Sequence, residues 1–294
     1  MPSSMANNLP LNILKKKDKT RVFSLVTFSF FLLMIAGIGK AQTNVNQRDA
    51  VSDKVVFTGV VSLDRLDNIY LTDQKNNLHK YDASGKFIST FSPPVTGHIA
   101  LLEAWNTAKI LLFYDDQQTI TFLDRFLAPI SSVRLSDQVD GIIKAASLAL
   151  DNKVWAFNES NFSLHKIDFQ FPEASRTIPL DLVLPKQQYD IRFLREYQNK
   201  LFLVDKLSGI YVFDNLGNYQ KRLPFTGLTY VGFRGDELYY LTNNQVNFFH
   251  LYTLQERTID LPISQNTNNY KQVLAGESNL YLISEKEIQI LPLK

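Results

Sequence analysis

One short unit of sequence recurs through most of this 294-residue chain, and its clearest copy lies at residues 59–91. The copy alternates runs of β-branched and aromatic residues with polar turns that contain Asn, Asp and Gly. The runs favour strands, and the turn residues tolerate the left-handed backbone that tight turns require. The unit is therefore predicted to be a meander of four antiparallel strands. Its third run, Leu-His-Lys-Tyr at 78–81, alternates apolar and polar residues, which predicts a half-buried strand.

The spacing of the copies predicts the fold. The second strand of the unit starts at Ile69, and equivalent runs start at Ile110, Val154, Leu201, Leu238 and Leu280. The mean spacing is about 42 residues, and a four-stranded propeller blade takes roughly 40–45 residues. Six copies predict an all-β fold, a six-bladed β-propeller of four-stranded antiparallel blades. An open stack of sheets, or two unrelated β domains, is the alternative.

The last copy of the unit contains only three of the four strands that a blade needs. The chain stops after three strands of blade six, and an unassigned strand-like run lies at 53–58, ahead of blade one. We expect this N-terminal strand to complete blade six and close the ring, because closure removes an exposed strand edge. The longest loop candidate in the repeat region is 182–188.

Four of the six copies end their third strand on an aspartate, namely Asp82, Asp124, Asp168 and Asp214. An aspartate ahead of a turn can accept hydrogen bonds from the backbone that follows it. We therefore expect these four carboxylates to be structural.

The first copy resembles an NHL repeat, a blade family of six-bladed propellers that are often extracellular or periplasmic. The resemblance lies in Gly-Val-Val-Ser-Leu-Asp at 59–64, Asp-Asn-Ile-Tyr-Leu-Thr-Asp at 67–73, the paired Asn76 and Asn77, and Tyr-Asp-Ala-Ser-Gly-Lys-Phe at 81–87. The arginine usual after the paired asparagines is Leu78 here. The resemblance implies a propeller. It does not choose among the protein-binding, RNA-binding and occasional enzymatic roles of such domains.

The N-terminus has the pattern of a signal peptide. A basic cluster at 15–21 precedes seventeen uncharged residues at 22–38, and Gly-Lys-Ala at 39–41 places small residues where a signal peptidase reads. Cleavage is expected before Gln42. The alternative is an uncleaved anchor helix, because seventeen residues lie at the short end of the range that can span a membrane. The predicted organisation is a signal peptide at 1–41, a flexible linker at 42–52 and a propeller at 53–294.

The composition limits the expected cellular location and the expected classes of partner. The chain has no cysteine, which together with the export signal suggests a bacterial protein of the periplasm or the extracellular space. Without residues 1–41 the chain holds 25 basic and 28 acidic residues, a net charge of −3. A nucleic-acid partner needs a basic face, so none is expected. Membrane contact is expected only through the signal segment, if it is retained.

The sequence contains few candidates for chemistry. His79 and His165 occupy equivalent places in blades one and three, about 120° apart in a six-fold ring, and a structural role is expected for them. No zinc-protease, nucleophile-elbow or nucleotide-binding motif occurs. Acidic residues recur in equivalent loops, at Asp73, Asp115, Asp116, Glu159, Asp205 and Glu285. A ring of carboxylates could bind Ca²⁺, but solvated loop acids are the default, so no catalytic residue, no metal ligand and no cofactor is predicted.

Two sets of residues are candidates for binding. The innermost strands are expected to line a central channel, with Asp64, Glu103, Arg192, Arg234 and Gln272 as the ligand-binding candidates. Glu103 and Arg192 are the two expected to reach an axial ligand. A contact patch is the second candidate, made by aromatic residues, which are enriched in interface cores, although blade-to-blade packing is the expected role of most of them. They are Trp105, Tyr189, Tyr230, Tyr239 and Tyr240.

Two hypotheses of function follow. The first is an exported, non-enzymatic binding or scaffold propeller that contacts proteins or small ligands. The alternative is a Ca²⁺-dependent hydrolase of the lactonase type with a site on the axis. They differ in whether three or more carboxylates or amides converge on the axis.

Overall fold

The computed structural model describes residues 50–51, 57–262, 270–284 and 287–293. The chain divides after Ala41 into two units, and all the described residues belong to the second. The predicted signal peptide and most of the predicted linker lie outside them. Within the described residues, no helix is long and apolar enough to cross a membrane.

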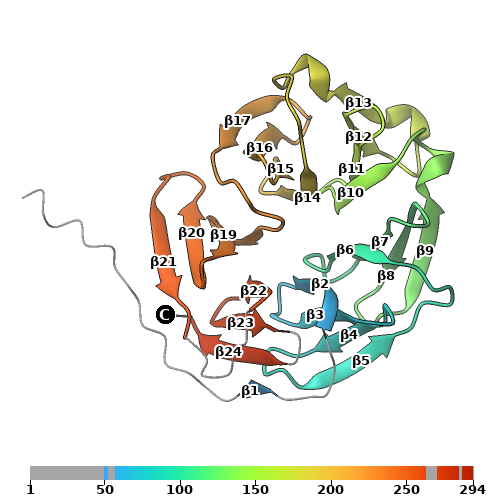
Figure 1. Cartoon of the computed structure of the whole chain (residues 1–294). Coiled ribbons are helices and arrows are strands. Elements are labelled where there is room, and N and C mark those ends of the chain that lie inside the picture. The colour runs from blue at the N-terminus through green and yellow to red at the C-terminus, as the bar shows by residue number, and fades with distance from the viewer. Residues whose placement is uncertain (1–49, 52–56, 263–269, 285–286, 294) are drawn as a thin grey trace, which may run out of the picture. The chain divides into compact units, whose positions relative to one another are not determined.

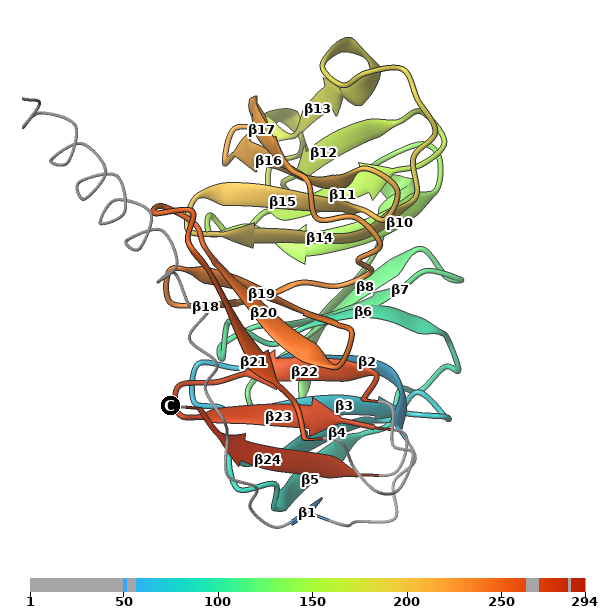
Figure 2. The same ribbon diagram turned by 60° about the vertical axis from the view of Figure 1, so that its left-hand side comes forward.

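The second unit is built from six four-stranded antiparallel sheets, which confirms the predicted six-bladed propeller. In Figure 1 the sheets surround a common centre, and Figure 2 shows their strands running side by side within each blade. The first strand of each blade is the innermost, and at five of the six blade junctions, all but that between blades 4 and 5, successive first strands pack against one another.

The first three blades are formed in chain order, each from four consecutive strands. Blade 1 comprises β2 (Phe57–Leu63), β3 (Ile69–Asp73), β4 (Leu78–Tyr81) and β5 (Phe87–Phe91). Blade 2 comprises β6 (Ile99–Glu103), β7 (Ile110–Tyr114), β8 (Thr119–Leu123) and β9 (Pro129–Arg134). Blade 3 comprises β10 (Ile143–Leu148), β11 (Val154–Asn158), β12 (Ser163–Ile167) and β13 (Arg176–Pro179).

The last three blades follow the same pattern, except at the end of the chain. Blade 4 comprises β14 (Ile191–Tyr197), β15 (Lys200–Asp205), β16 (Gly209–Asp214) and β17 (Tyr219–Leu223). Blade 5 comprises β18 (Gly232–Arg234), β19 (Glu237–Thr242), β20 (Gln245–His250) and β21 (Glu256–Asp260). Blade 6 comprises β22 (Gln272–Ala275), β23 (Asn279–Ile283), β24 (Ile288–Pro292) and the two-residue β1 (Ala50–Val51). Short 3-10 helices η1 (Leu135–Asp137), η2 (Pro172–Ala174) and η3 (Leu180–Leu182) lie in blade 3 and its connections.

The described part of the strand predicted to complete blade 6 lies in blade 1 instead. Residues 53–56 of the predicted run lie outside the described residues. Phe57 and Thr58 belong to β2 of blade 1, where Phe57 pairs with Asp73, so for them the prediction was wrong. The residues paired with β24 are Ala50, opposite Gln289, and Val51, opposite Ile288. Closure of the ring by the N-terminal segment stays a prediction.

Burial follows position within the blade. All five residues of β7 and of β11 are buried, because neighbouring blades cover both faces of these middle strands. The predicted half-buried strand at 78–81 is mostly buried for the same reason. Lys80 lies 5.3 Å from the centroid of the Tyr70 ring and donates to the Arg125 carbonyl of blade 2. The outermost strands β5, β9, β13 and β17 are mostly exposed.

The aspartates at the ends of third strands form the predicted caps. Asp214 accepts hydrogen bonds from the N–H of Leu216 and from the N–H and side-chain amide of Asn218, at 2.8–2.9 Å. Asp82, Asp124 and Asp168 accept from the backbone that follows them in the same way. The structural role predicted for these four residues is confirmed.

Replacement of one cap tests its contribution. Asp214→Ala leaves three donors without their acceptor, and we expect a loss of about 1–2 kcal/mol in the free energy of unfolding. In a chain of this size the melting temperature falls by about 2–6 °C. Calorimetry on Asp214→Ala and on Asp137→Ala, a change of an exposed residue in η1, measures this. Equal melting temperatures for the two variants would contradict the assignment.

Candidate functional site

The centre of the propeller is held by hydrogen bonds that pass from each blade to the next. Within the described residues every one of the six junctions has such a bond near the innermost strands. In chain order they join Ala104 N to Ser62 Oγ, Ser147 Oγ to Glu103 Oε2, Glu196 N to Ser147 Oγ, Tyr197 Oη to Gly235 O, Arg234 Nε to Gly276 O, and Glu277 N to Asp67 Oδ2. Donor–acceptor distances are 2.6–3.1 Å.

Two buried carboxylates belong to this belt of bonds. Glu103 also accepts from the N–H of Leu148, and the Nε of Arg195 lies 3.5 Å from its Oε2. Glu196 accepts from the indole N–H of Trp155 at 2.6 Å. Burial raises the pKa of Glu103 and of Glu196, and the hydrogen bonds to each carboxylate oppose the rise only in part.

The other residues predicted to line the channel are dispersed. Asp64 is buried and accepts from Leu66, Asn68 and the Tyr70 hydroxyl, so its carboxylate caps the β2–β3 turn. Arg192 is exposed and pairs with Asp190, with 2.6 Å between Nε and Oδ1. Arg234 donates to the carbonyls of Gly276 and Glu277 in blade 6. Gln272 is half-buried in β22.

The cavity on the axis is small. Its volume is about 30 Å³, and its lining includes Ser62, Trp105, Arg195, Tyr230 and Tyr239. One water molecule requires roughly 10–15 Å³ of such volume, so the cavity has room for about two. Pockets that take small molecules are usually about 300–1,000 Å³.

The histidines and loop acids serve the local structure. His79 and His165 contact Thr90 and Thr177 on the adjacent outer strands, at 2.8 and 3.1 Å. Burial pushes the pKa of Asp73 upward, but hydrogen bonds from Asn77, His79 and Lys75 outweigh it and lower that pKa to about 2. No group of three His, Cys, Asp or Glu is placed to hold a metal within the part of the chain described, which leaves out Glu285.

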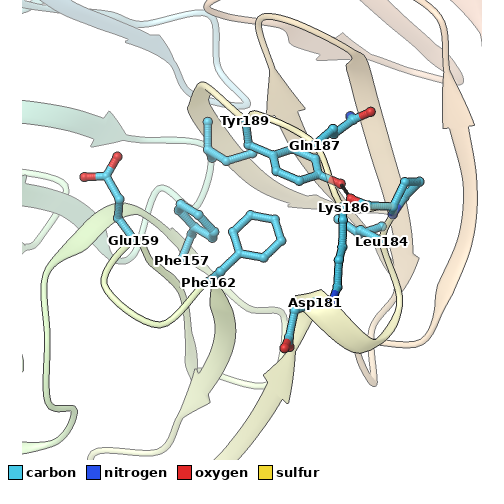
Figure 3. Close-up of a pocket in the computed structure, with 10 residues that line it drawn as sticks. Phe157, Glu159, Phe162, Asp181, Leu184, Lys186, Gln187 and Tyr189 are labelled. Carbon is cyan, nitrogen blue, oxygen red and sulfur yellow. Dashed lines mark hydrogen bonds between the residues drawn. The ribbon is translucent and has the colours of Figure 1, made fainter.

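A larger pocket lies between blades 3 and 4, away from the axis. Its volume is about 380 Å³. Three aromatic rings form one wall, those of Phe157, Phe162 and Tyr189, and Glu159 and Asp181 lie at two ends of the group (Figure 3). The ring centroids of Phe162 and Tyr189 are 4.6 Å apart, and those of Phe157 and Phe162 are 5.9 Å apart. Leu184, Pro185, Lys186, Gln187 and Ile191 complete the lining.

The loop on one side of the pocket, residues 180–190, is fixed along its length. Leu184 N donates to the Leu180 carbonyl and Tyr189 Oη to the Pro185 carbonyl, at 2.8 and 2.5 Å. At its end, Asp190 N donates to the buried Asp205 carboxylate at 2.6 Å. Burial, and then the hydrogen bond with Tyr211, raise the pKa of Tyr189, so its hydroxyl remains a donor at neutral pH.

Phe162 is the most unusual residue of the pocket. It has φ +50°, in the left-handed region that is costly for a bulky side chain. The same place ahead of the third strand holds Gln118 in blade 2, with φ +49°, and Asn244 in blade 5, with φ +58°. In all three blades the carbonyl of the residue at this position accepts a hydrogen bond from the backbone N–H of a leucine that follows the outer strand.

The side chain at this place differs between the blades. Gln118 bonds the backbone of Ile143, and Asn244 bonds the carbonyl of Leu261. Phe162 instead places its ring against Phe157 and Tyr189. A strained residue at a functional site is a common arrangement, which makes this pocket the candidate site.

The sequence pointed to part of this site. Tyr189 was among the predicted aromatic contacts, and 182–188 was the longest loop candidate. Tyr230 and Tyr239 line the axial cavity, Trp105 stacks edge-on to Tyr197, and Tyr240 packs against Phe225. Phe157 and Phe162 were missed. A signal for Phe162 was present, since an aromatic residue stands where blade 2 has Gln118 and blade 5 has Asn244.

The comparisons with known proteins support the fold. No family model matches the chain, and no curated protein matches it. Among solved structures, a catalytically inactive variant of virginiamycin B lyase from Staphylococcus aureus, determined with quinupristin, is similar. Its TM-score is 0.60 at 10% identity, over 84% of this chain and 99% of that one.

Two further structures are similar at comparable levels. BamB from Moraxella catarrhalis has a TM-score of 0.52 at 13% identity, over 86% of this chain and 98% of that one. YCF48, determined bound to D1 peptide, has a TM-score of 0.54 at 11% identity, over 87% and 98%. These neighbours include a lyase and a peptide-bound protein, so they confirm a β-propeller and leave its function open.

The buried carboxylates predict a pH dependence of stability. An acid whose pKa is raised on folding binds more protons in the native state, so its contribution falls as the pH rises through the window above about 4.5. Glu196→Gln keeps an oxygen for Trp155 but does not titrate. We expect its melting temperature, relative to the unmodified chain, to increase between about pH 4 and pH 8. Thermal scans across this range measure the difference; a constant or shrinking difference would contradict it.

Proposed function

We propose that this chain is an exported, non-enzymatic binding propeller of NHL-like repeats. We further propose that the pocket between blades 3 and 4 holds an aromatic or bulky aliphatic group of a protein or small ligand. The observation that carries the proposal is Phe162, whose ring walls the pocket from a left-handed position that polar residues fill in two other blades.

The geometry favours a binding role away from the axis. The pocket of about 380 Å³ is within the usual range for small ligands, whereas the axial cavity has room for little more than water. Its apolar wall provides the surface that a ligand ring buries. Glu159, Asp181 and Lys186 at the rim add polar groups that orient a ligand. Nothing in the arrangement requires a reaction.

The proposed location of the module is outside the cytoplasm. The basic cluster, the uncharged run at 22–38 and the small residues at 39–41 support export with cleavage before Gln42. The net charge of −3 without residues 1–41 supports protein or small-molecule ligands over nucleic acid.

Substitution of Phe162 separates function from folding. Phe162→Asn introduces a residue that tolerates the left-handed backbone, so relief of about 1–2 kcal/mol of strain offsets the lost ring contacts. We expect the melting temperature to change by less than about 3 °C. Saturation-transfer NMR with p-cresol and indole as probes should show at least about tenfold weaker binding than the unmodified chain.

A matched control is Phe126→Asn, at an exposed turn of blade 2, which should leave binding of both probes unchanged. Equal binding by the chain and by Phe162→Asn, or no binding of either probe to the unmodified chain, would refute the pocket as the site.

Closure of the ring is part of the proposal and has its own test. A chain that starts at Val55 lacks Ala50 and Val51, which pair with β24, so the edge of β24 becomes free to pair with other chains. We expect a lower melting temperature and self-association by light scattering. A chain that starts at Gln47 keeps the pair and serves as control. Identical behaviour of the two chains would rule out closure by this segment.

A further inference from the structure

A second groove lies on the outer side of the propeller, between blades 1 and 2. It has a volume of about 260 Å³, and its lining includes Pro93, Val95, Thr121, Ile130 and Ser132. No Asp, Glu, Lys, Arg or His is among its lining residues, all of which belong to the described part of the chain. One wall is the connection that follows β5, and the floor is formed by β8 and β9.

The groove exists because blade 2 has small side chains at one cross-strand pair. Thr121 of β8 lies opposite Ser132 of β9, and their hydroxyls are 3.2 Å apart. Larger residues fill the equivalent pairs of blades 1, 3, 4 and 5. Those pairs are His79 with Thr90, His165 with Thr177, Tyr211 with Arg222, and Asn247 with Thr258. At this pair the groove therefore meets two hydroxyl groups rather than larger side chains, while Phe91 and Tyr114 also line it.

The outermost strand beside the groove carries little of the charge that usually protects a sheet edge. The blade 2 sheet ends at β9, and no other strand among the described residues pairs with its outer edge. Natural proteins usually place charges on such edges to prevent pairing with other chains. In blades 4 and 5 the outer strands carry two and three charged residues, whereas β9 has only Arg134, at its end, and β5 has none.

Exposed apolar side chains accompany the unprotected edge. Val95 is 64% exposed and Ile130 is 54% exposed, and both line the groove. On β5, Phe87 and Ile88 are 47% and 48% exposed. Val95 and Ile130 thus add exposed apolar surface to the uncharged groove, and β5, the outer strand of the neighbouring blade, adds two more exposed apolar residues.

We propose that β9 is a docking edge for an extended, uncharged segment of a protein partner. The segment adds as a strand beside residues 130–134, since Pro129 has no N–H to offer, and inserts small apolar or hydroxyl side chains into the groove. Main-chain hydrogen bonds provide affinity in this mode, and the pocket for alternate side chains provides specificity. The lack of charge in the lining selects a neutral segment, because a buried charge would find no partner.

The size of the groove favours a peptide over a whole small molecule. About 260 Å³ is below the usual range of small-molecule pockets but sufficient for side chains that project from a bound strand. The groove is formed by different residues from the pocket between blades 3 and 4, so the two proposals are independent.

The test uses an acetylated, amidated heptapeptide of alternating Thr and Val as the probe. Hydrogen-exchange mass spectrometry with the peptide at about 1 mM should show slower exchange in 130–134. Two matched peptides serve as controls, one with N-methyl groups at every residue and one with Lys in place of the Val residues. Neither should protect this segment, because the first cannot pair along that edge and the second places charge in the groove.

Variants of the chain complete the test. Ile130→Lys adds the missing charge and should weaken binding of the Thr-Val peptide at least about tenfold. Leu254→Lys, at an exposed turn of blade 5, should leave it unchanged, as should Phe162→Asn. Ile130→Lys should in turn leave binding of p-cresol unchanged.

Three outcomes would overturn the proposal. The first is the absence of protection in 130–134 with the Thr-Val peptide. The second is equal protection by the N-methylated peptide. The third is self-association of the unmodified chain that Ile130→Lys abolishes, because the edge would then be occupied by a second copy rather than by a partner.

Discussion

The structure depends on the burial of the middle strands of each blade between two neighbours. Strands such as β7 and β11 are apolar along their whole length and have no solvent face. A sheet of this kind cannot stand alone in water, since each face must be covered by another sheet. Repetition around a ring satisfies this requirement for every blade, and the belt of hydrogen bonds near the axis fixes each blade against the next.

The belt engages several of the polar residues of the inner strands in contacts between blades. Glu103, Ser147 and Glu196 take part in bonds across two junctions, and Arg234 and Asp67 secure the junctions on either side of blade 6. Gly276 allows the closest of these approaches, since a Cβ there would lie 2.5 Å from the Asp67 carboxylate. Many of the polar groups near the axis thus serve the architecture, and the binding surfaces that we propose lie elsewhere.

Those surfaces arise where a repeated place in the blade holds a different kind of residue. Phe162 replaces the amide side chains of Gln118 and Asn244 and walls a pocket. Thr121 and Ser132 replace larger pairs and leave a groove. In a repeat fold the other blades therefore act as internal references, and the departures from them mark the candidate sites.

The sequence predicted the fold more fully than the site. Three of the six second strands start at the predicted residue and the other three start one residue earlier, because the repeat period records the strand pattern directly. The two-residue β1 carried no such pattern, and the run at 53–58 was assigned to the wrong blade in its described part. Burial was also underestimated at Lys80, which donates to the Arg125 carbonyl of the neighbouring blade.

The candidate site could be predicted only in part for a similar reason. Tyr189 and the loop at 182–188 were recognised, but their association with Phe157 and Phe162 depends on how blades 3 and 4 meet. The polarity of the inner strands was read correctly, yet Asp64 and Glu103 bond to nearby backbone in ways that the sequence did not reveal.

A crystal structure of the chain with p-cresol would test the central claim most directly. The account predicts the ring of p-cresol in the pocket between blades 3 and 4, in contact with Phe162 and Tyr189. A ring bound instead on the axis or at another blade junction would contradict it.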